Sequence, residues 1–330
     1  MTPVARTAQI AGKRILLTGG AGFIASHLVG LLAGANELTL LDNLRRNALD
    51  HLGPLPPGVV FIHGDILKPD TLESAVRDQD IVVHLAAIAG TRSVGLDVIR
   101  TMEVNFVGTR MCLEASARAG VTRFVCLSTS EVYGIHASDA SEDRATPIPP
   151  ATEGRWAYAA SKLAAEHLAL AYDRAGLVPS VVIRPFNVYG PRQVGEGAIH
   201  DMVAAAVAGR PITVRGTGHQ VRSWCFVEDF VDAVASALAV PDARGEIINV
   251  GNPRASATTM ELAETVARLA GSGIAISREP ALGPDVESRT PSIAKARRVL
   301  GFEPKVDLEE GVGRTIEWQR SLASGRPALA

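Results

Sequence analysis

The stretch Lys13-Arg-Ile-Leu-Leu-Thr18, followed by Gly19-Gly-Ala-Gly-Phe-Ile-Ala-Ser-His-Leu28, decides the fold of this chain. Its apolar first half predicts a β-strand, and its second half predicts a glycine turn that leads into a helix. Gly19 lets the turn close, and Gly22 lets the backbone approach a pyrophosphate. The small side chain of Ala25 lets the helix pack closely on the strand, while the helix N-terminus supplies amide donors. The stretch therefore predicts a strand–turn–helix unit that binds a dinucleotide.

A second apolar run, Glu37–Asp42, ends in an acid about 20 residues after the glycine turn, as a dinucleotide fingerprint requires. Asp42 can bind both ribose hydroxyls and would repel a 2′-phosphate, so it favours NAD over NADP. Arg45 and Arg46 follow closely and leave some attraction for a phosphate. The alternative is that Asp42 and Asn43 form an ordinary turn without a ligand.

Strands and helices continue to alternate along the first part of the chain, which is typical of an α/β protein with a parallel sheet. The next strand ends near Asp65, which could meet an adenine amino group, and the one after it ends in small residues where a cofactor could lie flat. We predict a doubly wound Rossmann sheet that binds ligands at the carboxyl ends of its strands. The further strands are expected over residues 59–66, 81–87, 123–128 and 181–190, and long helices over 98–119 and 156–175.

The pattern loosens after residue 190, where shorter strands and helices predict a smaller lobe. We predict an NAD-binding domain over residues 1–190 and a substrate-binding lobe over 191–330 that is interleaved with it. Residues 135–155 are polar and rich in proline, which indicates a loop over the site. In the lobe, helices are expected over 198–208, 229–240, 259–270 and 307–321, and strands over 211–215 and 246–251.

Tyr158 and Lys162 lie four residues apart on a predicted helix, so their side chains share one face. An ammonium beside a phenol favours the phenolate and lowers the pKa of the tyrosine. A tyrosine that ionises near neutral pH can take a proton from a sugar or alcohol hydroxyl. Thr129 or Ser130, just after the 123–128 strand, could hold the same substrate oxygen. The alternative for the Tyr–Lys pair alone is a surface helix without a catalytic role.

The composition excludes several classes of protein. With 330 residues, 47% of them hydrophobic and 21% charged, the chain resembles an ordinary globular enzyme, and its net charge of −2 predicts no nucleic-acid surface. It lacks a secretory signal and any run of about 18 apolar residues, so we expect a cytoplasmic protein without a membrane span. The eight histidines lack metal-ligand spacing, which predicts no metal site. The three cysteines are too few and scattered for a disulfide framework, and we expect them in the core: Cys112, Cys126 and Cys225.

Five motifs follow one another in a fixed order along the chain. They are TGGAGFIASHL from Thr18, the strand ending at Asp42, HLAA from His84, STSEVYG from Ser128 and YAASK from Tyr158. In this order they resemble the extended short-chain dehydrogenase/reductases, which include nucleotide-sugar epimerases, dehydratases and decarboxylases. The resemblance spans about residues 13–320. It implies tightly bound NAD, a nucleoside-diphosphate sugar in the smaller lobe and a homodimer.

The resemblance also implies roles for individual residues. Tyr158 would be the base that starts oxidation at sugar carbon 4, and Lys162 would hold the nicotinamide ribose and lower the pKa of the tyrosine. Thr129 would bond the reacting oxygen. Arg222 occupies a position that binds diphosphate, and a structural ion pair is the alternative for it.

Three features resemble UDP-glucuronate decarboxylases in particular. They are the triplet Thr129–Glu131, the stretch Arg155-Trp-Ala-Tyr158, and the segment Asp285–Ser292, which contains Arg289. A buried arginine can pair bidentately with the carboxylate of a uronic acid. We therefore predict a decarboxylase of UDP-glucuronate that makes a UDP-pentose. The alternatives for Glu131 and Arg289 are solvated surface positions.

Other outcomes remain open. The loop around Arg92 is more similar to that of 4-epimerases, which keeps a UDP-sugar or uronic-acid 4-epimerase as an alternative. Glucose 4,6-dehydratases carry aspartate at the position of Ser130, which weakens a dehydratase. A non-catalytic dinucleotide-binding protein and a dehydrogenase that uses free NAD are more distant alternatives.

These arguments select three groups of residues. The predicted catalytic residues are Thr129, Ser130, Glu131, Tyr158, Lys162 and Arg289. The predicted cofactor contacts are Gly19, Gly22, Phe23, Ile24, Asp42, Asn43, Asp65, Ile66, Leu85, Ala86, Ala87, Tyr158, Lys162 and Pro185. The predicted substrate contacts are Arg92, Arg155, Asn187, Arg192, Arg222 and Arg289.

Overall fold

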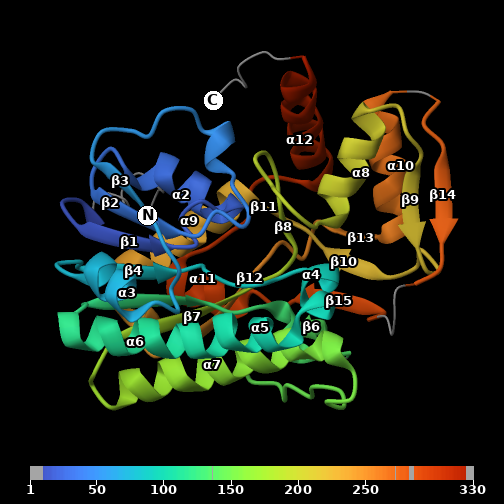
Figure 1. Ribbon diagram of the computed structural model, residues 1–330. Coiled ribbons are helices and arrows are strands. Elements are labelled where there is room, and N and C mark those ends of the chain that lie inside the picture. The colour runs from blue at the N-terminus through green and yellow to red at the C-terminus, as the bar shows by residue number, and fades with distance from the viewer. Residues whose placement is uncertain (1–9, 136, 272, 282–285, 325–330) are drawn as a thin grey trace.

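A parallel sheet of seven strands runs through the computed structural model, which describes residues 10–135, 137–271, 273–281 and 286–324 (Figure 1). The sheet confirms the predicted doubly wound α/β fold, since every neighbouring pair of its strands is parallel. The strand order reverses beside β1, and open sheets bind ligands at such a switch point. Across the sheet the order is β12 (Ile247–Val250), β7 (Ser180–Pro185), β5 (Arg123–Leu127), β4 (Ile81–His84), β1 (Arg14–Thr18), β2 (Glu37–Asp42) and β3 (Val59–His63).

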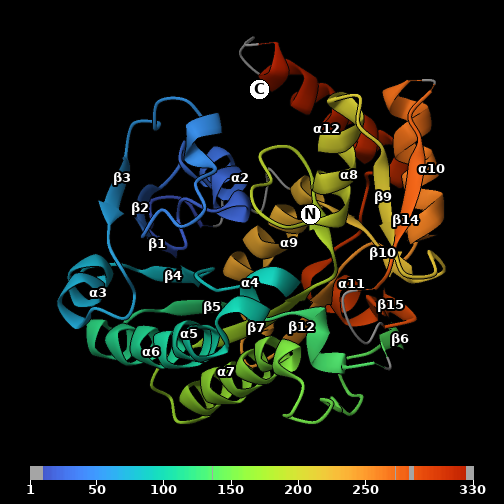
Figure 2. The ribbon, with the colours of Figure 1, turned by 45° about the vertical axis from the view of Figure 1, so that its right-hand side comes forward.

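Helices cover both faces of this sheet (Figures 1 and 2). Ile15 and Leu17 of β1 belong to the apolar core on one face, and Leu16 belongs to the core on the other. A strand that is buried on both faces needs apolar residues at every position, which explains the continuous apolar runs in the sequence. The first face carries α2 (Phe23–Leu32), α9 (Val227–Ala239) and α11 (Ala294–Leu300); the second carries α3 (Pro69–Val76), α6 (Gly108–Ala119) and α7 (Ala157–Arg174).

The helix predicted over 98–119 forms in three consecutive parts. They are α5 (Val98–Met102), a π-helical segment (Glu103–Val107) and α6, and the short helix α4 (Thr91–Leu96) precedes them. The buried Asn105 of the π-helical segment accepts a hydrogen bond from the Ile88 amide at 2.8 Å and donates one to its carbonyl at 3.0 Å. This side chain fixes the chain that leaves β4 beside the switch point.

The smaller lobe has an apolar core of its own, which lies beside the sheet in Figure 2. Its helices are α8 (Ala198–Val207), α10 (Thr259–Ala270) and α12 (Leu308–Ala323). One small sheet has the order β13 (Ser256–Thr258), β10 (Val221–Ser223), β15 (Ser288–Pro291) and β6 (Ala137–Ala140). Two-stranded pairs join β11 (Cys225–Phe226) to β8 (Val188–Tyr189) and β14 (Ile276–Glu279) to β9 (Ile212–Arg215).

Segments from both sides of residue 190 build the main layer, because β12 is an edge strand of the large sheet and α9 and α11 pack on one of its faces. The division into residues 1–190 and 191–330 stays a prediction. The expectation of an unbroken loop over 135–155 is wrong at β6, whose backbone pairs with β15 of the smaller lobe. Propensity could not show this strand, since its partner lies about 150 residues further along the chain.

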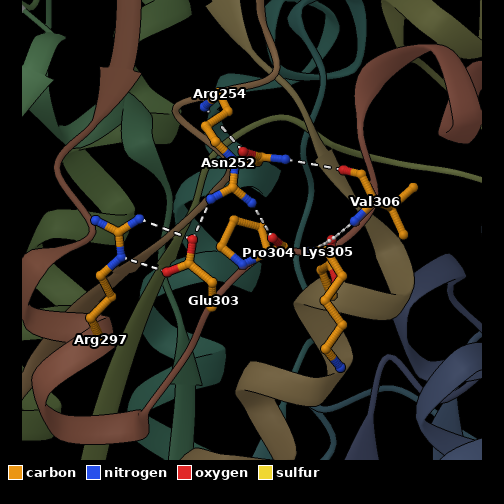
Figure 3. A network of polar contacts seen from close by, with 8 residues as sticks. Asn252, Arg254, Arg297, Glu303, Pro304, Lys305 and Val306 are labelled. Atoms are coloured by element: carbon orange, nitrogen blue, oxygen red, sulfur yellow. Dashed lines mark hydrogen bonds and ion pairs between the residues drawn. The ribbon is translucent and has the colours of Figure 1, made fainter.

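A polar network holds the linker between α11 and α12 (Figure 3). The carboxylate of Glu303 accepts hydrogen bonds from Arg297 at 2.6 and 3.0 Å and also pairs with Arg254. Asn252 donates to the carbonyl of Val306 at 3.1 Å. Since Arg254 and Asn252 follow β12, the network ties the chain that leads into α12 to one edge of the large sheet.

Candidate active site

The glycine turn between β1 and α2 forms one wall of a cavity. Gly19 has a φ of +70°, and a Cβ there would lie 2.7 Å from the backbone nitrogen of Ala86, so only glycine fits. Gly22 precedes the first turn of α2, and no side chain caps that turn. The amides of the first turn of α2 are therefore available to an anion, and they favour one electrostatically.

The cavity has a volume of about 390 Å³ and lies over the carboxyl ends of β1, β2 and β4. Glycines and the helix start suit a pyrophosphate, an acid follows β2 where a ribose would lie, and small side chains follow β4. These residues fit NAD. Every predicted cofactor contact lines this cavity, namely Gly19, Gly22, Phe23, Ile24, Asp42, Asn43, Asp65, Ile66, Leu85, Ala86, Ala87, Tyr158, Lys162 and Pro185.

Backbone amides of the neighbouring loops fix the position of the Asp42 carboxylate. Its carboxylate accepts hydrogen bonds from the Ala21 amide at 3.1 Å and from the Leu44 amide at 2.6 Å. Burial raises the pKa of Asp42, although these amides oppose the rise. Asp65 pairs with Arg100 at 2.6 Å and accepts from the Leu67 amide at 2.9 Å. Asp42 is the acid at the end of β2, where a ribose would lie, and this position suits a choice between NAD and NADP.

Tyr158 and Lys162 lie on α7 and line the same cavity. Lys162 is only 2% exposed, and its ammonium donates to the Leu127 carbonyl at 2.6 Å. Burial lowers the pKa of Lys162. The carbonyl at the end of β5 therefore holds the ammonium beneath the cavity.

The pKa of Tyr158 departs from the prediction. Burial raises it well above the ordinary tyrosine value, and the negative charge of Glu131 raises it further. A hydrogen bond with Thr129 and the charges of Arg289 and Arg46 lower it. The net lowering that the sequence predicts is not seen in this structure, because burial outweighs the groups that lower the pKa of Tyr158.

A short 3-10 helix, Ser130–Tyr133, follows the end of β5, and Thr129 is its N-cap residue. The Thr129 hydroxyl caps this helix by accepting from the Glu131 amide at 3.1 Å, and the same hydroxyl bonds with Tyr158. Ser130 is buried, and it lines neither of the two cavities. The helix therefore brings Thr129 to Tyr158 and turns Glu131 toward the second cavity.

A second cavity, of about 750 Å³, lies between the sheet and the smaller lobe. It carries several cationic side chains, which suits a charged substrate such as a sugar diphosphate. Arg222 also donates to the Val221 carbonyl at 2.9 Å, and Arg155 stacks on the Trp156 ring at 4.6 Å. The predicted residues that line this cavity are Arg92, Glu131, Arg155, Asn187, Arg222 and Arg289.

Arg192 lines neither cavity, in contrast to the prediction that it binds substrate. Its guanidinium donates to the Ser26 carbonyl at 3.2 Å and to the His27 ring at 3.0 Å. The residue follows directly on Gly190 and Pro191 and turns back onto α2 with a φ of +64°. In this structure it joins the loop after β8 to the cofactor side of the molecule.

Arg289 is the most unusual cation of the second cavity. It is 6% exposed, and its Nη1 lies 3.4 Å from the Glu131 carboxylate. Its Nε and Nη2 have no hydrogen-bond partner among the described residues. Buried guanidinium donors are costly to leave unpaired, so this arrangement favours an anionic ligand.

The sequence reasoning missed two sets of residues. Ser128 and Arg184 both bond to the buried Glu166, with the arginine bidentate at 2.6 and 2.8 Å. Glu166 follows Tyr158 and Lys162 at the helical spacing of four, which is a signal that could have found it. The other set comprises Arg46, Ser93, Gln193 and Glu196, which line the cofactor cavity although the sequence did not select them as cofactor contacts.

Several expected absences can be compared with the described residues. No cluster of three or more potential metal ligands occurs among them. Within residues 10–324, apart from the gaps given above, every helix is too short or too polar to span a lipid bilayer. All three cysteines are buried and unpaired, and burial raises their pKa values. Asp285 of the late segment lies outside the described residues.

Comparisons with known proteins agree with this geometry. The sequence model of the NAD dependent epimerase/dehydratase family matches residues 15–251. UDP-N-acetyl-alpha-D-glucosaminuronate decarboxylase of Bacillus cytotoxicus is 34% identical over 94% of this chain and 98% of its own. UDP-glucuronic acid decarboxylase 5 of Arabidopsis thaliana is 36% identical over 91% and 87%. The crystal structure of UDP-glucuronic acid 4-epimerase from Bacillus cereus, with UDP-glucuronic acid and NAD, superposes with a TM-score of 0.86 at 30% identity, covering 94% of this chain and 99% of that one.

Proposed function

The chain belongs to the NAD dependent epimerase/dehydratase family, and we propose that it releases CO₂ from a UDP-hexuronic acid, as UDP-glucuronate decarboxylases do. It is an NAD-dependent enzyme that modifies nucleotide sugars. The observation that carries the choice of a uronic acid as substrate is Arg289, which is buried in the substrate cavity with two donors that lack a partner among the described residues. A carboxylate on the sugar would satisfy both donors.

The position of Arg289 supports this choice of substrate. Its charge and that of Glu131 both act on the pKa of Tyr158, so all three groups lie close together. A carboxylate held by Arg289 would therefore sit near the hydroxyl that Tyr158 deprotonates. In a hexuronic acid the carboxylate is attached to carbon 5, next to the reacting carbon 4.

The first chemical task of the protein is proton removal from the carbon 4 hydroxyl. Bound NAD supplies a hydride acceptor that later returns the hydride, so the alcohol becomes a ketone and is restored at the end. Tyr158 accepts the hydroxyl proton, and Thr129 positions the same oxygen. The hydrogen bond of Thr129 and the charges of Arg289 and Arg46 favour the phenolate that this step requires.

The ketone at carbon 4 makes the substrate a β-keto acid. Its bond between carbon 5 and the carboxylate breaks, CO₂ leaves, and the electron pair moves into an enolate. Thr129 and Tyr158 contact the enolate oxygen and stabilise its charge. A proton must then reach carbon 5, and Glu131, Arg289 and Ser130 are the candidates to orient or deliver it.

A uronic-acid 4-epimerase is the second candidate. Arg92 lines the substrate cavity, and the Bacillus cereus epimerase is similar to this chain over most of its length. In that reaction the carboxylate is held but not lost, so Arg289 alone does not separate the two outcomes. A 4,6-dehydratase is less favoured, because Ser130 stands at the position where glucose 4,6-dehydratases carry an aspartate.

Mass spectrometry of the products separates these reactions. The purified enzyme is incubated with UDP-glucuronate, UDP-N-acetylglucosaminuronate and a panel of neutral UDP-, dTDP-, GDP- and CDP-sugars. We expect loss of CO₂ from one of the two uronates. A product of unchanged mass would indicate an epimerase and contradict the decarboxylase proposal, and loss of water would indicate a dehydratase.

We also propose a cytoplasmic homodimer that has no nucleic-acid or membrane partner. Support for the dimer comes from Leu96 and Ile99, which are 86% and 75% exposed beside the long helix. Leu168 and Leu170 of α7 are partly covered by the core of their own chain. Light scattering at micromolar concentration should give twice the mass of the chain, and a monomer would contradict the proposal.

A further inference from the structure

Glu196 lies where the two cavities meet, and it lines both of them. It belongs to the loop between β8 and α8, on the side of the smaller lobe. Its side chain is 16% exposed, although no apolar core surrounds it. The Glu196 carboxylate faces a cavity that suits a negatively charged dinucleotide. Other groups must therefore bind this carboxylate to offset the charge repulsion.

The carboxylate of Glu196 is bound by two other segments. Its Oε1 accepts from the Ser93 hydroxyl at 2.6 Å and from the Ser93 amide at 2.9 Å, and its Oε2 accepts from the Arg92 amide at 2.8 Å. Arg46, from the loop after β2, lies 3.4 Å from Oε1 and also donates to the Ala89 carbonyl at 2.9 Å. Burial opposes ionisation, yet these bonds lower the pKa of Glu196.

Two glycines let this contact form. A Cβ on Gly195, whose φ is +88°, would lie 2.5 Å from Nε of Arg46. A Cβ on Gly90, whose φ is +99°, would lie 2.7 Å from the carboxyl carbon of Glu196. A Cβ at either position would therefore displace the Arg46 or Glu196 side chain from this contact, and the positive φ favours glycine at both.

We propose that Glu196, Arg46 and Ser93 form a clasp that retains the cofactor. The clasp joins the loop after β2 and the first turn of α4 to the loop before α8, and all three segments line the cofactor cavity. The cofactor must open this contact to leave. Retention has a chemical purpose, because a reaction without net redox change needs the hydride back in the same active site.

If the clasp retains the cofactor, loss of one of its residues should raise the rate at which NAD is released. The protein loaded with NAD is diluted into an excess of alcohol dehydrogenase and ethanol, so that released NAD is reduced and fluoresces. We expect Glu196→Ala and Arg46→Ala each to speed release by about tenfold or more, the scale of a charged hydrogen bond. The control Glu309→Ala removes an exposed ion pair with Arg268 on α12 and should leave release unchanged.

A double variant separates the clasp from two independent contacts with NAD. If the residues act through each other, Glu196→Ala with Arg46→Ala releases NAD no faster than the faster single variant. Multiplying effects would overturn the clasp, and so would unchanged or slower release by Glu196→Ala. Glu196→Gln serves if the alanine variant does not fold. No sugar takes part, so the result is independent of the decarboxylase proposal.

Discussion

The cofactor cavity and the substrate cavity meet at Gln193 and Glu196, but the chain builds the two cavities in different ways. The first is made by the ends of neighbouring parallel strands, and strand–helix alternation in the sequence predicts that these strands are parallel. The second depends on pairings between distant segments: Arg222 and Arg289 lie side by side on β10 and β15. Local motifs therefore determine the first cavity, whereas tertiary structure determines the second. Each prediction below tests one side of this difference or the place where the cavities meet.

The largest expected effect concerns Tyr158, which lines the cofactor cavity. Tyr158→Phe removes the proton acceptor but keeps the ring, and losing a positioned general base typically costs on the order of 10²–10⁴ in rate. NAD should stay bound, because the other contacts of the cofactor cavity remain. Steady-state turnover and the NAD content of the purified variant measure the two effects. Near-normal turnover would remove Tyr158 from the mechanism.

In the substrate cavity, Arg289→Ala and Glu131→Ala should suppress CO₂ release more than the initial formation of NADH. Removing the charged hydrogen bond from Arg289 to the substrate carboxylate costs about 10- to 100-fold. Removing Glu131 takes away a candidate to deliver the proton to carbon 5. Single-turnover absorbance follows NADH, and mass spectrometry follows CO₂ loss. Arg222→Ala is the matched control on the next strand, and we expect it to raise KM instead. Equal losses in both steps would assign Arg289 to binding alone.

The sequence predicted the cofactor side in more detail than the substrate side for physical reasons. Glycine turns and strand ends are local features, so Gly19, Asp42 and the residues after β4 could be placed before the structure was known. The hydrogen-bond partners of individual side chains could not be predicted in this way. Arg192 turned back onto His27, and the Lys162 ammonium found a backbone carbonyl, because such contacts depend on loop paths that no short pattern encodes.

Cofactor preference tests the side that the sequence predicted best. Asp42→Ala should raise the affinity for NADP relative to NAD by about tenfold, since a charge that repels a 2′-phosphate is removed. Equilibrium binding of both cofactors measures the ratio. Because Asp42 also holds the amides of Ala21 and Leu44, Asp42→Asn provides a control for loosening of the turn. Tighter binding of NADP by the unmodified protein would contradict the assignment.

The smallest effect concerns the join between the loop after β8 and α2. His27 accepts at Nδ1 from Arg192, which can only donate, so its Nε2 must donate to the Pro191 carbonyl at 2.8 Å. This pairing requires a neutral ring. Burial, and then the charge of Arg192, lower the pKa of His27 from 6.5 to about 3.

The sign of the pH dependence follows from that shift. Between pH 6.5 and about 3 the unfolded chain holds the His27 proton and the folded protein does not, so stability is complete above this window and falls as the pH falls through it. His27→Gln should flatten the slope of the unfolding free energy by up to about 1.4 kcal/mol per pH unit. Urea unfolding from neutral pH down to about pH 4 measures the slope. An equal slope in both proteins would mean that the ring is already charged and that the loop after β8 is not held to α2 by this neutral pairing.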